Sequence, residues 1–124
     1  MHDYNDALIL DGVASVLKGI ALLRSRMLER WRELNGNAQP EDFKRFQSEG
    51  HVAAYSFSPP FYELGEDMWE VIKRHFFDTF SPTKEEDFDT VAYNCAQECT
   101  GLFFGALQQR WLRRYFPNGD AKPE

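Results

Sequence analysis

Apolar residues in the first third of the chain recur with the period of an α-helix. Their steps of four and three positions run through Ile9, Val13, Val16, Ile20, Leu23 and Met27. This spacing places the side chains on one helical face, which predicts an amphipathic helix over about residues 5–34. Asn35-Gly36 is a standard place for such a helix to end. About thirty residues at 1.5 Å each make a helix of about 45 Å.

A second stretch near the end of the chain has the same spacing. Its apolar and small residues are Phe88, Ala92, Cys95, Cys99, Leu102 and Ala106. They predict a helix over about residues 83–116, which ends before Pro117. Its start is left open between Ser81, an N-cap candidate followed by proline, and Thr83 in a capping box with Glu86. Two helices of similar length predict side-by-side packing.

The middle of this second helix, residues 99–107, carries no charge on any side. We therefore expect it to be surrounded by protein at the centre of the bundle. Gly101 and Gly105 each cost about 1 kcal/mol relative to alanine inside a helix, and a backbone passing close by would explain both. The charged and polar residues on either side argue against a membrane-spanning helix pair as the reason for this Gly-x-x-x-Gly spacing.

Shorter elements are predicted between the two long helices. Pro40 begins a short helix that we expect to stop at Gly50. Residues 51–62 predict a loop, because two consecutive prolines disfavour helix just before them. A further helix is expected to begin at about residue 61 or 66 and to end at about residue 80.

Length and composition predict one domain, residues 1–124, in which four to five helices form a compact all-α bundle. The polar end of the chain, residues 118–124, predicts a frayed tail. A hydrophobic content of 43% argues against disorder, and no uncharged run reaches the roughly 18 residues of a membrane span. We therefore expect a soluble protein with no membrane partner.

The charge of the chain bears on its partners and its location. A net charge of −6 argues against direct binding of nucleic acid, which needs clustered lysine and arginine. The basic cluster of Arg110, Arg113 and Arg114 lies where a helix C-terminus itself favours positive charge. The first six residues are acidic where a secretion signal would be basic, which predicts a cytoplasmic location.

Two pairs of acidic residues stand at predicted helix starts: Glu63 with Glu66, and Glu86 with Asp89. Acidic residues three apart share a helix face, so two such pairs on neighbouring helices would form a carboxylate cage for Mg²⁺. The pattern resembles the metal motif of the all-α nucleoside triphosphate pyrophosphohydrolases, the MazG-like and dimeric dUTPase group. The resemblance implies a dimeric, Mg²⁺-dependent enzyme whose metal is held by these four carboxylates. The helix dipole alone also explains acids in a first turn.

Other residues with chemical potential have structural interpretations. Cys95 and Cys99 lie on successive turns of one predicted helix face, and no second pair of cysteines or histidines completes a zinc site, so we interpret them as packing residues. His75 has no carboxylate or nucleophile at a catalytic spacing and is interpreted as a histidine at the core boundary. No convincing catalytic set emerges, and no cofactor is expected outside the Mg²⁺ hypothesis.

Four aromatic residues crowd the predicted loop: Tyr55, Phe57, Phe61 and Tyr62. Two interpretations are open. If the loop is exposed, it anchors a protein partner, because aromatic side chains provide large contact area at low entropy cost. If it is buried, it forms a lid over one end of the bundle.

The small size, the acidic charge and the lack of a catalytic set favour a binding function. We expect a small acidic protein-binding module, such as an inhibitor or adaptor carried by a phage or mobile element, that masks a surface of another protein. An acidic chain suits a basic surface, including one that otherwise holds nucleic acid. A homodimer is compatible with the sequence, and the Mg²⁺-dependent pyrophosphohydrolase is the alternative hypothesis.

Overall fold

The computed structural model describes residues 2–57 and 62–115, without the side chains of residues 2–6 and 8. Every regular element in these ranges is helical. In chain order they are α1 (His2–Glu33), the 3₁₀ segment η1 (Pro40–Phe46), α2 (Gln47–Ala54), α3 (Tyr62–Lys73), the π-helical segment η2 (Arg74–Asp78) and α4 (Glu86–Tyr115). The predicted all-α fold is confirmed, and the predicted tail at 118–124 lies outside the described residues.

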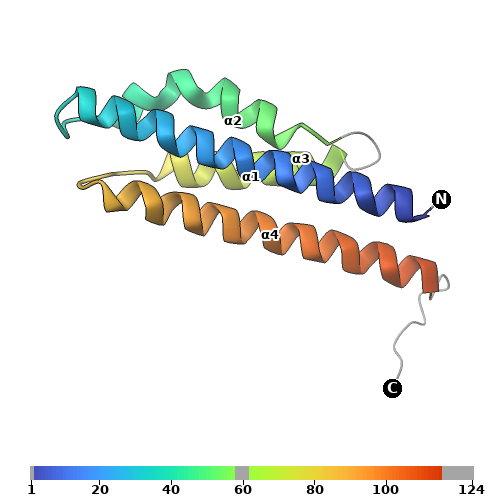
Figure 1. The fold of residues 1–124 in the computed structure, drawn as a ribbon. Helices are drawn as coiled ribbons and strands as arrows, with labels where there is room; N and C mark the ends of the chain where they lie inside the picture. Colours follow the sequence, from blue (N-terminus) through green and yellow to red (C-terminus); the bar gives the residue numbers. More distant parts are fainter. Residues whose placement is uncertain (1, 58–61, 116–124) are drawn as a thin grey trace.

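The two long helices run side by side in opposite directions, and the shorter helices complete the bundle (Figure 1). α1 begins at the end of the molecule where α4 ends. α2 packs on α1 and α3, and α3 packs in turn on α4. Both long helices match the prediction to within a few residues at each end. None of the described helices combines the length and apolarity needed to cross a membrane.

The core contains the helical stripe predicted in the first third of the chain. All six of its residues are buried, with exposed fractions of at most 7%. Where α1 ends and α4 begins, Phe88 lies in an aromatic cluster. Its ring centroid is 5.0 Å from that of Phe80, 5.7 Å from that of Trp31 and 6.2 Å from that of Phe43, all in edge-on geometry. Such pairs contribute about 0.5–1.5 kcal/mol each beyond the area that they bury.

A carboxylate caps the start of α4. Asp87 Oδ2 accepts hydrogen bonds from the backbone N–H groups of Thr83 (2.6 Å) and Lys84 (3.0 Å), and from the Thr83 hydroxyl (3.0 Å). The bond from the Thr83 backbone is the main cause that lowers the pKa of Asp87. The capping carboxylate is therefore Asp87 and not Glu86, because the turn that precedes the helix brings the free N–H groups to the later residue.

Gly50 lies inside α2 and does not end it, contrary to the prediction. A Cβ at Gly50 would lie 3.0 Å from Ile72 Cγ2, so the glycine lets α2 and α3 pack closely. At Gly65 of α3 a Cβ would lie 2.7 Å from the carbonyl oxygen of Ala54. The loop predicted over residues 51–62 is shorter than expected, because this packing supports α2 as far as Ala54.

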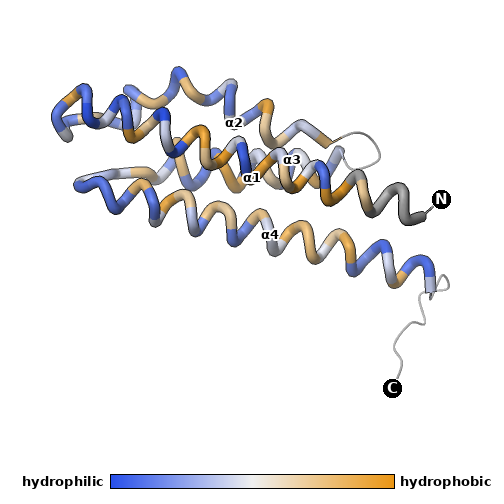
Figure 2. Tube along the Cα trace, in the orientation of Figure 1, coloured by the Kyte–Doolittle hydropathy of each residue, from blue (hydrophilic) through white to orange (hydrophobic). Residues whose placement is uncertain are grey.

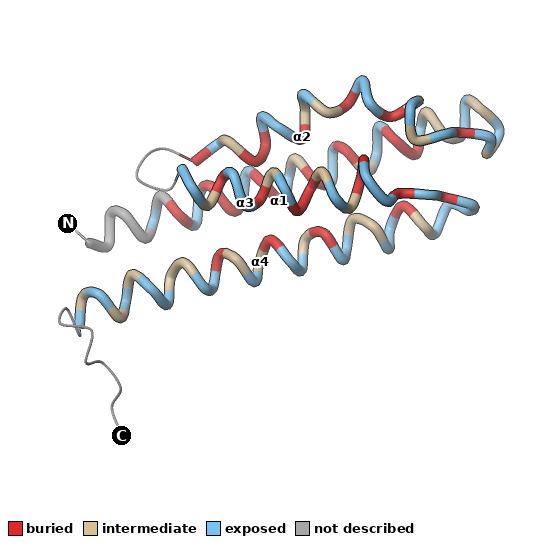
Figure 3. The backbone as a smooth tube through the Cα atoms, turned by 180° about the vertical axis from the view of Figure 1, so that it is seen from behind, coloured by how far each residue is buried: buried red, intermediate tan, exposed pale blue. Residues whose placement is uncertain are grey.

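The second half of α4 is exposed, and the prediction that it lies at the centre of the bundle is wrong. Gly101 and Gly105 face open space, with no packing neighbour within 4 Å of where a Cβ would lie. Beyond Phe103, α4 has only exposed and intermediate positions (Figure 3), although hydrophobic residues continue there (Figure 2). Among the longer helices, α4 packs only on α1 and α3. One face of α4 therefore points away from the bundle.

Candidate functional site

Four ring side chains from α2, from the residue that follows it and from α3 form a continuous surface cluster. The His51 ring centroid lies 4.5 Å from that of Tyr55 and 5.2 Å from that of Trp69, and the Tyr55 ring lies 5.7 Å from Tyr62. Tyr62 is 55% exposed, whereas Tyr55 and Trp69 are partly buried. His51 and Tyr55 are one helical turn apart, and the close approach of the two helices at Gly50 brings Trp69 beside them.

Helix α3 also exposes four carboxylates: Glu63, Glu66, Asp67 and Glu70. Among the described residues, only Glu70 of these four has a cation within 4 Å, the ammonium of Lys73 at 3.3 Å. Partial burial raises the pKa of the Tyr55 phenol, and the negative charges of Glu66 and Glu70 raise it further. Tyr62, Glu66 and Glu70 also follow one another at one-turn steps of α3, which places both carboxylates on the side of the helix that carries the Tyr62 ring. The aromatic–acidic face is the set His51, Tyr55, Tyr62, Glu66, Trp69 and Glu70.

The structure separates the four aromatic residues that the sequence groups as partner-binding. Tyr55 and Tyr62 belong to the aromatic–acidic face. Phe57 is only 7% exposed, and its ring occupies the space beside Gly12 of α1, where a Cβ would lie 2.2 Å from Phe57 Cε1. Phe57 thus covers α1, as the lid interpretation expects, and is not an exposed anchor. Phe61 lies outside the described residues.

The two predicted carboxylate pairs lie on different helices and beside distant parts of α4. Glu86 and Asp89 occupy the first turns of α4, where Asp89 Oδ1 lies 2.6 Å from Nη2 of Arg24 in α1. Glu63 and Glu66 begin α3, and Glu63 lines a groove with Gly105. Asp89 and Gly105 are separated by roughly 24 Å of helix at 1.5 Å per residue. The described part of the chain has no group of three or more His, Cys, Asp or Glu residues that could hold a metal ion. The Mg²⁺-dependent enzyme stays an untested hypothesis.

Ion pairs join the start of α4 to the end of α1. Both oxygens of Glu85 accept hydrogen bonds of 2.9 Å, from Nε and Nη2 of Arg32. The Arg32 guanidinium lowers the pKa of the Glu85 carboxyl, and the carboxylate raises the pKa of Arg32. Arg24 and Asp89 form a second pair, about two turns from Arg32 along α1 and about one turn from Glu85 along the chain. The acidic first turns of α4 thus have a structural role in the docking of the two long helices.

A second charged cluster joins η2 to α4. Glu98 accepts hydrogen bonds from both terminal nitrogens of Arg74, and its Oε1 lies 2.9 Å from His75 Nε2. The bonds from Arg74 and then His75 lower the pKa of Glu98 to about 2. The sequence does not predict Glu98 as the carboxylate partner of His75, because Glu98 comes 23 residues later and no spacing rule connects a π-helical segment with another helix.

Cys95 and Cys99 are free thiols that are both fully buried, as their interpretation as packing residues expects. The hydrogen bond to Cys99, together with burial, raises the pKa of the Cys95 thiol far above its ordinary value. The thiolate is the reactive form of cysteine, so Cys95 stays protonated and unreactive.

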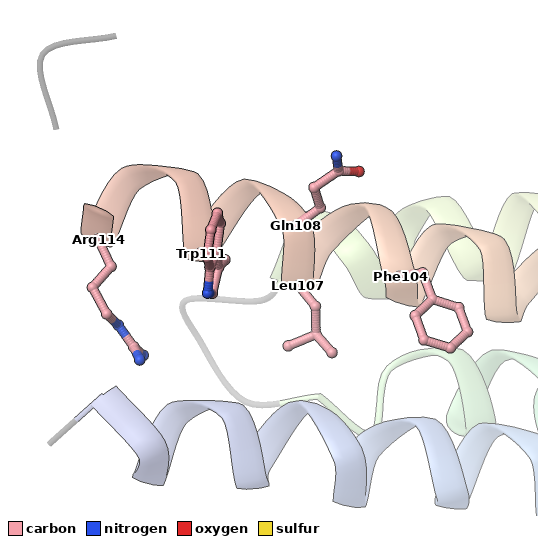
Figure 4. Close-up of a pocket in the computed structure, with 5 residues that line it drawn as sticks. All are labelled: Phe104, Leu107, Gln108, Trp111 and Arg114. Atoms are coloured by element: carbon pink, nitrogen blue, oxygen red, sulfur yellow. The ribbon is translucent and has the colours of Figure 1, made fainter. Parts of the chain in front are cut away.

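An unpredicted surface runs along the outer face of α4. Its large side chains are Tyr93, Phe104, Trp111 and Tyr115, with exposed fractions of 62, 61, 53 and 55%. An open groove beside it is lined by Phe104, Leu107, Gln108, Trp111 and Arg114 (Figure 4). In this view Leu107 points toward α1 and Gln108 points away from it. Exposed apolar side chains gathered in this way mark interaction surfaces. The sequence did not predict this surface, because the uncharged run 99–107 predicts an interior position.

Comparisons of the chain with protein-family models, with curated proteins and with solved structures gave no match. The fold defines the class of the protein as an all-α helical bundle. Within that class, the two exposed aromatic surfaces are the features from which a function can be argued.

Proposed function

We propose that this chain is a small acidic protein-binding module whose aromatic–acidic face masks a basic surface of another protein. The observation that supports this most is the position of Glu66 and Glu70 near the connected rings of Tyr55 and Tyr62. The rings offer contact area, and the carboxylates offer charge beside it. Both come from a single pair of packed helices.

The chemistry of the aromatic–acidic face indicates the kind of surface that it fits. Tyrosine and tryptophan are enriched among the residues that dominate binding energies, because they supply large area with few rotatable bonds. Exposed carboxylates pair with lysine and arginine, and a guanidinium also stacks on an aromatic ring. A surface rich in arginine and lysine, such as one that otherwise binds nucleic acid, is therefore its complement.

Close helix packing supports the geometry of this face before any partner binds. Its residues lie on α2, on α3 and at Tyr55 directly after α2, and the two helices approach each other closely at Gly50 and Gly65. The Tyr55 ring lies between those of His51 and Tyr62, which restricts its rotation. Because a preorganised surface loses less conformational entropy on binding, more of its contact energy appears as affinity.

The net charge of −6 favours the same class of partner. Opposite charge accelerates encounter with a basic surface, and like charge disfavours nucleic acid itself. Binding of this kind weakens with salt, since the screening length falls from about 10 Å at 0.1 M to about 3 Å at 1 M ionic strength. We propose an inhibitor or adaptor of a phage or mobile element as the biological setting, by analogy of size and charge.

Capture of proteins from a native-cell or host extract tests this function. Four immobilised proteins are compared: the wild type, Tyr62→Ser, the double variant Glu66→Lys with Glu70→Lys, and the control Glu41→Lys. The control reverses an exposed charge on η1, away from the aromatic–acidic face. We expect the wild type and the control to retain the same basic protein, and the double variant to lose it. Tyr62→Ser should weaken the affinity at least about tenfold.

The outcome that refutes the proposal is equal capture by the wild type and the double variant. Circular dichroism of each variant verifies that the helices are intact, which is expected because all the changed side chains are exposed. Elution at high salt is a second readout, since a contact that does not depend on charge would resist it.

A further inference from the structure

Glu66 is the carboxylate of the aromatic–acidic face that has a ring on each side of it along α3. Tyr62 precedes it by four residues and Trp69 follows it by three. Side chains at these separations are neighbours on one helical face. The Tyr55 ring adds a third aromatic surface, since its centroid lies 5.7 Å from that of Tyr62. A cation that pairs with Glu66 therefore has an aromatic ring within reach.

The chain itself leaves the charge of Glu66 uncompensated. Among the side chains that the structure describes, Glu66 has no cation within 4 Å, whereas Glu70 pairs with Lys73 at 3.3 Å. Burial is the main cause that raises the pKa of the Tyr55 phenol, and the negative charge of Glu66 is the next. Because Lys73 already offsets part of the charge of Glu70, Glu66 is the carboxylate that is left for a partner.

We propose that an arginine side chain of the partner binds here, with its guanidinium paired to Glu66 and stacked on the ring of Tyr62. Arginine is thereby the anchor of the basic partner proposed above, and its role rests on that proposed function. Glu66 and Tyr62 together then determine a preference for arginine over lysine.

The packing of the rings decides where a cation can lie. The centroids of His51 and Trp69 are 5.2 Å apart in edge-on geometry, and those of His51 and Tyr55 are 4.5 Å apart. Rings at these separations are in contact with each other, so no ammonium group fits between them. The accessible surface is on the outer side, where Tyr62 is 55% exposed. A flat cation lies well on such a surface, whereas a quaternary ammonium group is recognised by rings that surround it.

Arginine and lysine differ in how they use a ring and a carboxylate that lie side by side. The guanidinium is planar and weakly hydrated, so its face stacks on a ring while its edge donates two parallel hydrogen bonds to a carboxylate. The ammonium group of lysine is a compact, strongly hydrated point charge. Tyr62 and Glu66 are one helical turn apart, which corresponds to about 5–6 Å between their Cβ atoms. Arginine can therefore make both contacts at once, and lysine gains mainly from the charge.

Calorimetric titration of the full chain with octa-arginine and with octa-lysine tests this preference. The two peptides carry the same number of charged side chains, so attraction by charge alone predicts similar affinities. We expect octa-arginine to bind at least about tenfold more tightly. Two-dimensional NMR should show the largest shifts for the amide groups of residues 62–70, because these residues carry the ring and the carboxylate.

Variants of α3 locate the preference. Glu66→Gln removes the charge and keeps the size of the side chain, and Tyr62→Leu removes the ring and keeps the charges. Each should reduce the ratio of the two affinities to about twofold or less. Tyr62→Phe keeps the ring and should keep the ratio. The control Glu63→Gln removes an equal charge from the same helix, outside the aromatic–acidic face, and should weaken both peptides alike. All three positions are exposed, so the helical circular dichroism should be unchanged.

Equal affinity of the wild type for the two peptides would overturn the arginine anchor and leave the proposed binding of basic proteins in place. Failure of both peptides to bind would instead contradict the proposed function, and the anchor with it. A preference for arginine that survives in both Glu66→Gln and Tyr62→Leu would mean that another part of the surface selects arginine, which would also overturn the proposal.

Discussion

The same glycine-to-alanine change should have opposite effects on stability at Gly65 and Gly105. Inside a helix, alanine is about 1 kcal/mol more favourable than glycine, because glycine loses more backbone freedom on folding. Both residues lie inside helices, α3 and α4 respectively. The helical gain is therefore the same in the two variants, and the difference between them measures what the new methyl group meets.

At Gly105 the methyl group meets open space, so Gly105→Ala should raise the free energy of unfolding by about 1 kcal/mol. At Gly65 the methyl carbon would lie 2.7 Å from the carbonyl oxygen of Ala54, a backbone atom that moves only if α2 moves. Overpacking of this kind costs about 1–3 kcal/mol. After the helical gain is subtracted, Gly65→Ala should lower the free energy of unfolding by up to about 2 kcal/mol.

Urea denaturation followed by far-ultraviolet circular dichroism measures both changes. The two midpoints should lie on opposite sides of the wild-type value, with the same dependence of free energy on urea concentration. In a thermal melt, 1 kcal/mol corresponds to about 3–5 °C for a domain of this size. A Gly105→Ala protein less stable than the wild type would mean that another segment covers this side of α4. A Gly65→Ala protein that gains as much stability as the Gly105→Ala protein would refute the close approach of α2 and α3.

Two other substitutions test the aromatic core and a charged cluster. Phe88→Ala removes a ring that is 0% exposed. It should lower the free energy of unfolding by about 3–5 kcal/mol in the same urea titration. A loss below about 1 kcal/mol would contradict the central position of this ring. The pKa of Glu98 is lowered from 4.5 to about 2 in the folded protein, so its pairing stabilises the fold above pH 4.5 and is lost as the pH falls toward 2. Since this side chain is 42% exposed, screening limits the effect to about 1 kcal/mol. Glu98→Gln should remove that part of the acid dependence in melts from pH 2 to 5, and an unchanged pH profile would count against the cluster.

Local patterns in the sequence were enough to predict the elements and one side of each long helix. The stripe from Ile9 to Met27 is buried as predicted, because helical spacing alone decides which side chains share a face. The prediction for the first half of α4 is also confirmed, because Phe88, Cys95 and Cys99 are buried. For the candidate binding face, the sequence indicated Tyr55 and Tyr62, together with Phe57, which is buried. It indicated Glu66 only as a metal ligand. It did not indicate that His51 and Trp69 would join them, since that depends on how α2 crosses α3.

What the tertiary structure decided is which helical faces have neighbours. Gly50 and Gly101 both lie inside helices, yet a Cβ at Gly50 would touch another helix and a Cβ at Gly101 would touch nothing. The bond between His75 and Glu98 likewise exists only because η2 packs on α4. Periodicity describes one helix at a time, whereas burial depends on the position of a second element that is distant in the sequence. For that reason the amino-acid sequence determined the helices and their apolar faces, and only packing determined that the outer face of α4 is exposed.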